Sequence, residues 1–482
     1  MLSPNQESLR RLPGVDTLLQ DARLQEHAKG VPQRIVVDSV RVGLAEARKR
    51  LIAEEAGAVD QGAIDGAIVA RALEHIRFAM GRHYRRVINA TGIILHTALG
   101  RAVLPARALR QIEEELSGYS LLQADIESGS RSGRDRRIEW LFQQLTGTEA
   151  ATVVNNNAAA TMIALNTVGR GKEVIVSRGH LVEIGGSFRL PEVMAASGAR
   201  LVEVGTTNKT HARDYERAIT ENTAALMRVH PSNYKISGFT SEVSLHEMVA
   251  IAHAHGLPLI DDVGAGSLID FARFGFDPEP TLLESVREGA DLITASADKL
   301  IGASQGGVIL GKAQWIAAVR SNPLARVVRV GKLTLAALEA TLSLFLDESV
   351  ALKEVPTLRM LDRSLAEITE QARRICQAIG RGLDQERGQR SRAAIVTDTE
   401  GSSQMGSGSL PTQNLATRLV AISPTTIEPG ELALRLRRHE PPVFTRVHKG
   451  QLLIDPRTLQ EGEEDVLVGA VVTALRDCAG GV

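Results

Sequence analysis

The sequence is poor in cysteine and aromatic residues and has almost no net charge. Of its 482 residues two are cysteines, too few for a disulfide framework or a cysteine-based zinc site, so we expect no metal and a cytoplasmic setting. Aromatic residues make up 3%, which disfavours a module built from many base-stacking platforms. We find no long apolar run and no apolar leader, so neither a membrane span nor a secretory signal is expected. With a net charge of −1, a nucleic-acid partner requires a local basic patch.

The length and the 43% hydrophobic and 23% charged residues are typical of a globular protein with two or three domains. Patterning divides the chain into an N-terminal helical domain (1–80), a large catalytic domain (81–332) and a small α+β domain (333–482). Up to Arg86 the chain has 14 Lys and Arg against 11 Asp and Glu. Arg48, Lys49 and Arg50 form its densest basic cluster, for which a solvated helix face and an RNA-binding face are equally open interpretations.

Short β-branched runs alternate with helical stretches between residues 88 and 330. This alternation predicts an α/β fold with a mostly parallel sheet, and several runs are apolar throughout, as in strands covered on both faces. The predicted strands are Ala151–Val154, Glu173–Val176, Leu201–Val204, Ala225–Val229, Pro258–Asp262, Leu292–Thr294 and Gly307–Leu310.

The C-terminal region combines helical and strand-like patterns. Val443–Val447 and Gln451–Ile454 flank a His-Lys-Gly turn and are predicted to form a hairpin. The Gly- and Ser-rich stretch Thr399–Ser409 is predicted to be a flexible surface loop.

Lys299 follows a predicted buried strand in the stretch Leu292–Gly311. The carboxyl ends of parallel strands are where α/β sheets bind ligands. Burial lowers the pKa of a lysine amine and makes it a usable nucleophile and base. Lys299 is therefore a candidate for the lysine that binds pyridoxal 5′-phosphate covalently.

Two further strand ends strengthen this interpretation. Asp261 and Asp262 end another predicted strand and point to opposite faces; we expect Asp261 to meet the ring nitrogen of the cofactor and Asp262 to lie behind it. The stretch Ala151–Thr161 runs from a strand through Asn156, Asn157 and Ala158 into a helix, a suitable cradle for the phosphate. A polar turn, an acid and a lysine in this order predict a type-I pyridoxal-phosphate-dependent transferase fold.

The sequence resembles bacterial selenocysteine synthases, the L-seryl-tRNA(Sec) selenium transferases, over essentially its whole length. The segments that carry the resemblance are Leu12–Leu19, Arg85–Ala102, Ser177–Met194, Val204–Thr210, Arg228–Phe239, Ser296–Gly307 and Pro441–Leu459.

The resemblance implies that the seryl group of seryl-tRNA(Sec) loses water and that selenium from selenophosphate then adds to it. It further implies an N-terminal domain that recognises the tRNA, and a homo-oligomeric ring of dimers, for which we expect a decamer. By the resemblance, Asp298 tunes Lys299, and Arg101, Arg326 and Arg329 bind the selenium donor. Arg326 and Arg329 are expected to share a helix face. The remaining pocket residues expected are Ser296, His230, Ser232 and Asn233.

The chain departs from the usual family pattern at Ala297, Ala303, Ser304 and His180, where the family usually has Gly, Gly, Pro and Glu. Two alternatives stay open. One is a related pyridoxal-phosphate-dependent ammonia-lyase acting on an amino sugar phosphate, although those relatives lack the N-terminal helical segment. The other is a non-catalytic tRNA-binding relative, which the intact Asp261 and Lys299 disfavour.

Overall fold

The computed structural model describes residues 12–53, 61–185, 188–384 and 393–476. Contacts divide the chain into two compact units, residues 1–86 and 87–482. The predicted boundary at 80 thus lies close to the end of the first unit. The predicted boundary at 332 falls inside the second unit and stays a prediction. In the described part of the chain, no helix is long and apolar enough to cross a membrane.

The N-terminal unit is a helical bundle in which two long helices pack closely. Gly43 of the first long helix allows this approach, because a Cβ there would lie 2.5 Å from the carbonyl oxygen of Ile68 on the second. Val36, Val40 and Ala72 are buried between them. The helices are α2 (Val15–Leu18), α3 (Ala22–His27), α4 (Gln33–Ala53) and α5 (Gln61–Met80).

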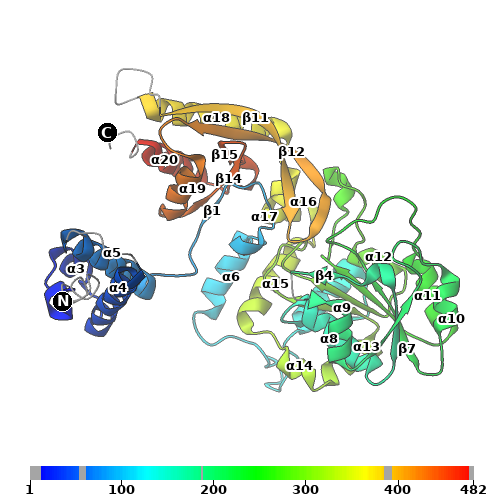
Figure 1. Ribbon diagram of the computed structural model, residues 1–482. Coiled ribbons are helices and arrows are strands. Elements are labelled where there is room, and N and C mark those ends of the chain that lie inside the picture. Colours follow the sequence, from blue (N-terminus) through cyan, green and yellow to red (C-terminus); the bar gives the residue numbers. More distant parts are fainter. Residues whose placement is uncertain (1–11, 54–60, 186–187, 385–392, 477–482) are drawn as a thin grey trace. The chain divides into compact units, whose positions relative to one another are not determined.

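A seven-stranded sheet forms the centre of the second unit (Figure 1). Its strand order is β2-β10-β9-β8-β7-β3-β6, and β10 alone runs antiparallel to its neighbours. The seven predicted strands are all present, so the predicted, mostly parallel α/β fold is confirmed. The strands are β2 (Ala150–Val154), β3 (Glu173–Ser177), β6 (Arg200–Val204), β7 (Thr223–Val229), β8 (Leu259–Gly264), β9 (Leu292–Ser296) and β10 (Gly307–Gly311).

Helices cover both faces of this sheet, and alternate strand residues enter two different cores. Val174 and Ile260 pack against α8, whereas Ile175 and Leu259 belong to the core of the opposite face. The first face is covered by α8 (Asn157–Gly169), α9 (Leu190–Ser197) and α13 (Ala313–Ser321). The second is covered by α7 (Arg136–Thr146), α10 (Ala212–Ala218), α11 (Leu245–Ala254), α12 (Leu282–Arg287) and α15 (Lys332–Leu344).

Several shorter elements complete this part of the chain. They are the helices α6 (Ala106–Leu116), α14 (Leu324–Val327), α16 (Glu348–Glu354) and α17 (Pro356–Asp362) and the short strands β4 (Glu183–Ile184) and β5 (Phe188–Arg189).

A second sheet, antiparallel and ordered β11-β12-β15-β14, builds the C-terminal part of the chain. The predicted hairpin around Lys449 and Gly450 is confirmed as β14 (Arg446–His448) paired with β15 (Gln451–Ile454). The other elements are β11 (Ala394–Gly406), β12 (Ser409–Pro424), α18 (Leu365–Asp384), α19 (Pro429–Arg438) and α20 (Glu463–Arg476).

The prediction of a flexible loop at Thr399–Ser409 is wrong, because most of this stretch is strand β11. Ser403 and Met405 are fully buried. Ser403 donates to the buried carboxylate of Asp455 at 2.7 Å, and a Cβ at Gly401 would lie 2.4 Å from Leu419 Cδ1. The small residues are therefore there for close packing, and only the Ser407–Gly408 turn remains outside the strands.

The β11–β12 hairpin reaches from the second sheet to the first, as Figure 1 shows. Near its tip, Leu95 N–H donates to the carbonyl of Met405, and the Ser407 hydroxyl donates to the carbonyl of Leu95, both at 2.7 Å. A Cβ at Gly408 would lie 3.0 Å from Asn233 Cβ. Farther back, β1 (Ile88–Asn89) pairs in parallel with β13 (Val443–Phe444). The segment that leads to Arg101 is therefore held by C-terminal residues.

Candidate active site

Lys299 lies just beyond β9, at the carboxyl edge of the large sheet, and only 6% of its surface is exposed. Burial lowers the pKa of its amine, and the positive charge of Arg101 lowers it further. Asp298 and Asp262 oppose this by attracting the charged form. Desolvation is the dominant effect, so the neutral, nucleophilic amine forms more readily here than in a solvent-exposed lysine.

Arg101 and Asp298 form an ion pair beside Lys299, with Arg101 Nη1 2.7 Å from Asp298 Oδ2. Arg101 has φ +62°, a left-handed conformation that is uncommon for residues other than glycine. Its N–H donates to the carbonyl of His96 at 3.0 Å, which closes the turn that holds it. Such strained backbone is often found at functional sites. The structure thus brings Arg101, Asp298 and Lys299 together.

Asp262 is a second carboxylate whose charge acts on Lys299. Its Oδ1 accepts from Asn157 Nδ2 at 2.9 Å and from the N–H of Gly264 at 3.1 Å, and its Oδ2 accepts from the Thr161 hydroxyl at 3.0 Å. Burial raises the pKa of Asp262, and these hydrogen bonds lower it in part. A buried acid of this kind is stabilised in its charged form by a nearby cation.

The expectation that Asp261 meets the cofactor ring stays a prediction, and the structure gives Asp261 and Asp262 different surroundings. Asp261 and Leu259 are two residues apart on β8 and point to the same face of the sheet, which is the face away from α8. There, Asp261 Oδ2 accepts from Ser285 Oγ at 2.7 Å. Its Oδ1 lies 3.5 Å from Arg228 Nε. Asp261 therefore anchors α12 and Arg228, whereas Asp262 points toward α8.

The N-terminus of α8 forms the cradle predicted for a phosphate. Asn156 caps this helix, since its Oδ1 accepts from the N–H of Ala159 at 2.9 Å. The first N–H groups of a helix, here those of Asn157 and Ala158, have no acceptor within the helix. Gly307 packs against the turn, and a Cβ there would lie 2.0 Å from the carbonyl oxygen of Asn156. This close packing holds the helix end against β10.

Two neighbouring strands contribute histidines to the same edge of the sheet. His180 follows β3 and is buried, and burial together with the positive charge of Arg228 lowers its pKa to about 4. His230 follows β7, where its N–H donates to the carbonyl of Asp262 at 2.9 Å and its Nε2 lies 2.8 Å from Glu279 Oε2. The neutral His180 was singled out from the sequence only as a departure from the family pattern.

Several polar atoms at this edge are buried without a hydrogen-bond partner among the described residues. They are Asn157 Oδ1, His180 Nδ1, Ser232 Oγ and Asn233 Oδ1. Buried polar atoms are almost always paired, so such a group indicates a polar ligand. A buried amine, a buried acid, free helical N–H groups and these unpartnered atoms fit pyridoxal 5′-phosphate. Ser296, the last residue of β9, is buried beside them.

Arg326 and Arg329 do not share a helix face, contrary to the prediction. Helix α14 ends at Val327, and Arg329 forms an antiparallel bridge with Val154 at the end of β2. Both arginines are exposed. They lie near Arg134, whose pKa is lowered by burial and by the positive charges of Arg329, Arg131 and Arg326.

Arg134 is a residue that the sequence analysis did not select, although GSRSGRDRR (129–137) is visibly basic. It donates to the carbonyl of Val330 and to Gln123 Oε1, both at 2.8 Å. It thereby joins the loop before α7 to the segment that carries Arg329.

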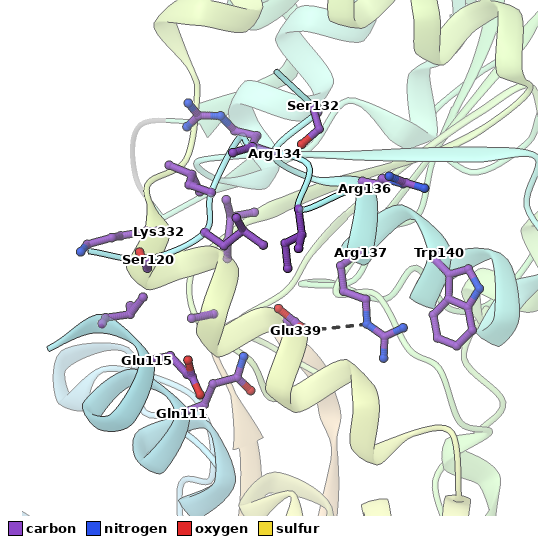
Figure 2. A pocket seen from close by; sticks show the side chains of 18 of the residues that line it. Gln111, Glu115, Ser120, Ser132, Arg134, Arg136, Arg137, Trp140, Lys332 and Glu339 are labelled. Carbon is purple, nitrogen blue, oxygen red and sulfur yellow. Dashed lines mark ion pairs between the residues drawn. The ribbon is translucent and has the colours of Figure 1, made fainter. Parts of the chain in front are cut away.

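A hollow of about 1090 Å³ lies beside this loop, between α6, α7 and α15 (Figure 2). Arg137 stacks on Trp140 at 4.3 Å and lies 3.7 Å from Glu339. Arg134 and Lys332 line the same hollow. None of the residues expected to bind cofactor or donor does, so this hollow is separate from the candidate active site.

The strand order, the lysine after β9 and the acid at the end of β8 define the fold of type-I pyridoxal-phosphate-dependent enzymes. A solved structure of D-glucosaminate-6-phosphate ammonia-lyase has this fold: it is 22% identical, with a TM-score of 0.55, and the match covers 84% of this chain and 99% of that one.

Family models assign the chain more narrowly. The model for L-seryl-tRNA selenium transferase matches residues 87–460, and the model for the selenocysteine synthase N-terminal region matches residues 9–48. The chain belongs to the L-seryl-tRNA selenium transferase family. Among its relatives, the L-seryl-tRNA(Sec) selenium transferase of Alkaliphilus metalliredigens is 43% identical and that of Geobacter sulfurreducens 44%. Each match covers 97% of this chain and 99% of the relative.

Proposed function

We propose that this protein converts L-seryl-tRNA(Sec) into L-selenocysteinyl-tRNA(Sec), with pyridoxal 5′-phosphate as cofactor and selenophosphate as selenium donor. The observation that carries the proposal is the buried Lys299, set between the Arg101–Asp298 ion pair and the carboxylate of Asp262. The match over nearly the full length to L-seryl-tRNA(Sec) selenium transferases supports it.

Different residues of the site would hold different parts of the cofactor. Lys299 would bind it covalently, and Asp262 would pair with its ring nitrogen. Asn157 and Ala158 would donate N–H groups to its phosphate, and His180 would line the pocket from the next strand. When bound, this cofactor acts as an electron sink for the charge that develops at the α-carbon of the substrate.

Lys299 also handles protons. Once its amine is free, Lys299 would take the α-proton of the seryl group and return a proton to the departing hydroxyl, and burial favours the neutral amine that this requires. Asp298 lies next to it and is itself held by Arg101. This pair sets the charge around the amine and orients it.

Arginines supply the sites for the selenium donor. A small multiply charged anion is best bound by guanidinium groups. Arg101 is at the cofactor site, and Arg329 forms a bridge to Val154 at the end of β2. Arg326 is close enough for its charge to act on Arg134 together with that of Arg329. Each of the three remains a proposed donor-binding residue, with Arg134 supporting the last two.

The N-terminal unit would bind the tRNA. It has a net positive charge up to Arg86, and Arg48, Lys49 and Arg50 are exposed at the end of α4. In a ring of dimers, for which we propose ten subunits, one tRNA would contact several copies and gather dispersed charges. An aminoacyl-tRNA substrate implies a cytoplasmic location.

The deciding experiment is turnover of seryl-tRNA(Sec) with selenophosphate by the cofactor-loaded protein, with seryl-tRNA(Ser) as the control substrate. We expect selenocysteinyl-tRNA from the first substrate alone. In Lys299→Ala, product should be absent and no cofactor should stay attached after borohydride reduction and denaturation, whereas Lys172→Ala, which changes an exposed lysine, should behave as wild type. Release of ammonia from an amino sugar phosphate without selenium transfer would favour the ammonia-lyase alternative.

A further inference from the structure

Phe239 is an aromatic side chain left almost fully in solvent, with 88% of its surface exposed. It lies in the loop between β7 and α11, the same loop that places His230 and Ser232 at the candidate active site. Phe78, Tyr84 and Tyr119 are also exposed. Phe239 differs from them because its loop also carries residues of the candidate active site.

Hydrogen bonds hold this loop rigidly to the neighbouring loop between β6 and α10. Asn208 Nδ2 donates to the carbonyl of Phe239 at 2.7 Å, and the N–H of Ser241 donates to the carbonyl of Asn208 at 3.0 Å. Lys209 and Ser241 form a parallel bridge, and the N–H of Thr210 donates to Ser241 at 2.9 Å. The backbone beneath the exposed ring is therefore preorganised.

A cation accompanies the ring. Lys209 Nζ lies 6.0 Å from the centre of the Phe239 ring. Among the described residues, the Phe239 ring is the interaction partner of the Lys209 ammonium. Lys235 of the same loop is instead neutralised by Asp277, at 2.8 Å. An aromatic face beside an uncompensated cation is the combination with which proteins bind single-stranded nucleic acid, by stacking on a base and contacting a phosphate.

The location matches the substrate. Between β9, which leads to Lys299, and β6, which leads to Lys209, the sheet has four strand intervals, or roughly 19 Å at about 4.8 Å each. A seryl group bound at Lys299 cannot span this distance, so a substrate contact at Lys209 would be made by the RNA attached to that serine.

We propose that Phe239 and Lys209 bind the single-stranded 3′ end of the aminoacyl-tRNA, Phe239 by stacking on a base and Lys209 by contact with a phosphate. The inference rests on the proposed function and adds a contact outside both the N-terminal unit and the catalytic residues.

The test compares two RNAs on the cofactor-loaded, full-length protein: uncharged tRNA(Sec) with its 3′-terminal single-stranded nucleotides, and the same tRNA trimmed of them. Phe239→Ala should weaken binding of the intact tRNA by roughly tenfold and leave binding of the trimmed tRNA unchanged. Lys209→Ala should act in the same direction, with a smaller salt dependence. Phe239→Tyr should restore binding, and Phe239→Leu should not. Ile395→Ala, which removes another exposed apolar side chain, is the matched control.

Equal affinity of wild type and Phe239→Ala for the intact tRNA overturns the inference. An equal loss for both RNAs, with a changed sedimentation coefficient, also overturns it and assigns this face to contacts between copies. The proposed function is tested separately, because wild-type protein that makes no selenocysteinyl-tRNA refutes it whatever Phe239 does. If the wild-type protein is active and the Phe239→Ala variant binds the tRNA normally, only the contact proposed for Phe239 and Lys209 is refuted.

Discussion

Asn157 donates from Nδ2 to Oδ1 of Asp262 across 2.9 Å, and this hydrogen bond joins the N-terminus of α8 to the end of β8. The helix end offers N–H groups to an anion, and the strand end offers a buried acid. The two residues therefore fix the spacing between the positions proposed for the phosphate and the ring nitrogen of one cofactor.

The two adjacent carboxylates should differ in what they support. Asp262→Asn removes the negative charge next to the proposed ring nitrogen, and we expect kcat to fall roughly hundredfold or more, as for other single electrostatic groups. Asp261→Asn should leave kcat near wild type and lower the free energy of unfolding by about 1–3 kcal/mol, because it weakens a buried contact with Arg228 and Ser285. Steady-state kinetics and urea unfolding measure the two effects. If Asp261→Asn lowers kcat and Asp262→Asn does not, Asp261 is the residue that contacts the ring nitrogen.

Arg101 should set the pH at which Lys299 reacts. Its charge lowers the pKa of the lysine, and it also neutralises Asp298, which raises that pKa. Arg101→Gln should therefore raise the pKa of Lys299 and move attachment of the cofactor to apoprotein to higher pH. The measurement is the rate of attachment across a pH series, with Arg101→Lys as the charge-preserving control. A Gln variant with an unchanged profile would contradict the assigned coupling.

His180 should make stability depend on pH. Its pKa is about 4 in the folded protein and about 6.5 in an unfolded chain, so between these values the unfolded chain binds a proton that the folded one does not. The free energy of unfolding should fall by about 3 kcal/mol as the pH drops through this window. His180→Gln should remove that part of the slope. Urea unfolding at several pH values measures it, and parallel profiles for wild type and variant would exclude the effect.

Substitutions of the basic residues proposed to bind the tRNA and of those proposed to bind selenophosphate should have separate effects. Replacing Arg48, Lys49 and Arg50 with Ala should weaken tRNA binding and reduce its salt slope by up to about 3, since each lost phosphate contact contributes about 0.9. The KM for selenophosphate should not change. Arg326→Ala should raise that KM about tenfold and leave tRNA affinity as it was. Binding isotherms at two salt concentrations and donor kinetics decide this, with Lys172→Ala, an exposed lysine at the opposite edge of the sheet, as control.

Local patterns in the sequence were enough to predict the large sheet. Most of its strands are buried on both faces and appear as apolar runs, whereas the edge strand β6 is partly exposed. Lys299 and Asn157 each come within a few residues of such a run. That the two carboxylates point to opposite faces was also within reach of the alternation rule. Asp262 and Ile260 are two residues apart on one strand, so they point to the same face, and Ile260 packs on α8. The alternation rule does not say which face α8 covers, so it could not choose between the two carboxylates.

Features that depend on long-range packing were not predictable in this way. The composition of Thr399–Ser409 is that of a linker, yet its small side chains fit against Leu419 and Asp455 on elements distant in sequence. Arg134 and Arg329 are close only because a loop and a strand end meet. The spacing of Arg326 and Arg329 is helical, but α14 ends between them.

The pairing of β1 with β13 has a consequence for synthesis on the ribosome. Ile88 is made early and Val443 late, and their strands pair with each other. Residues near 405, also late, hold the backbone of Leu95. A nascent chain that already contains Lys299 therefore lacks the partners that position Arg101, and such distant pairings form slowly. We therefore expect the active-site turn that carries Arg101 to form only when translation of the protein is nearly finished.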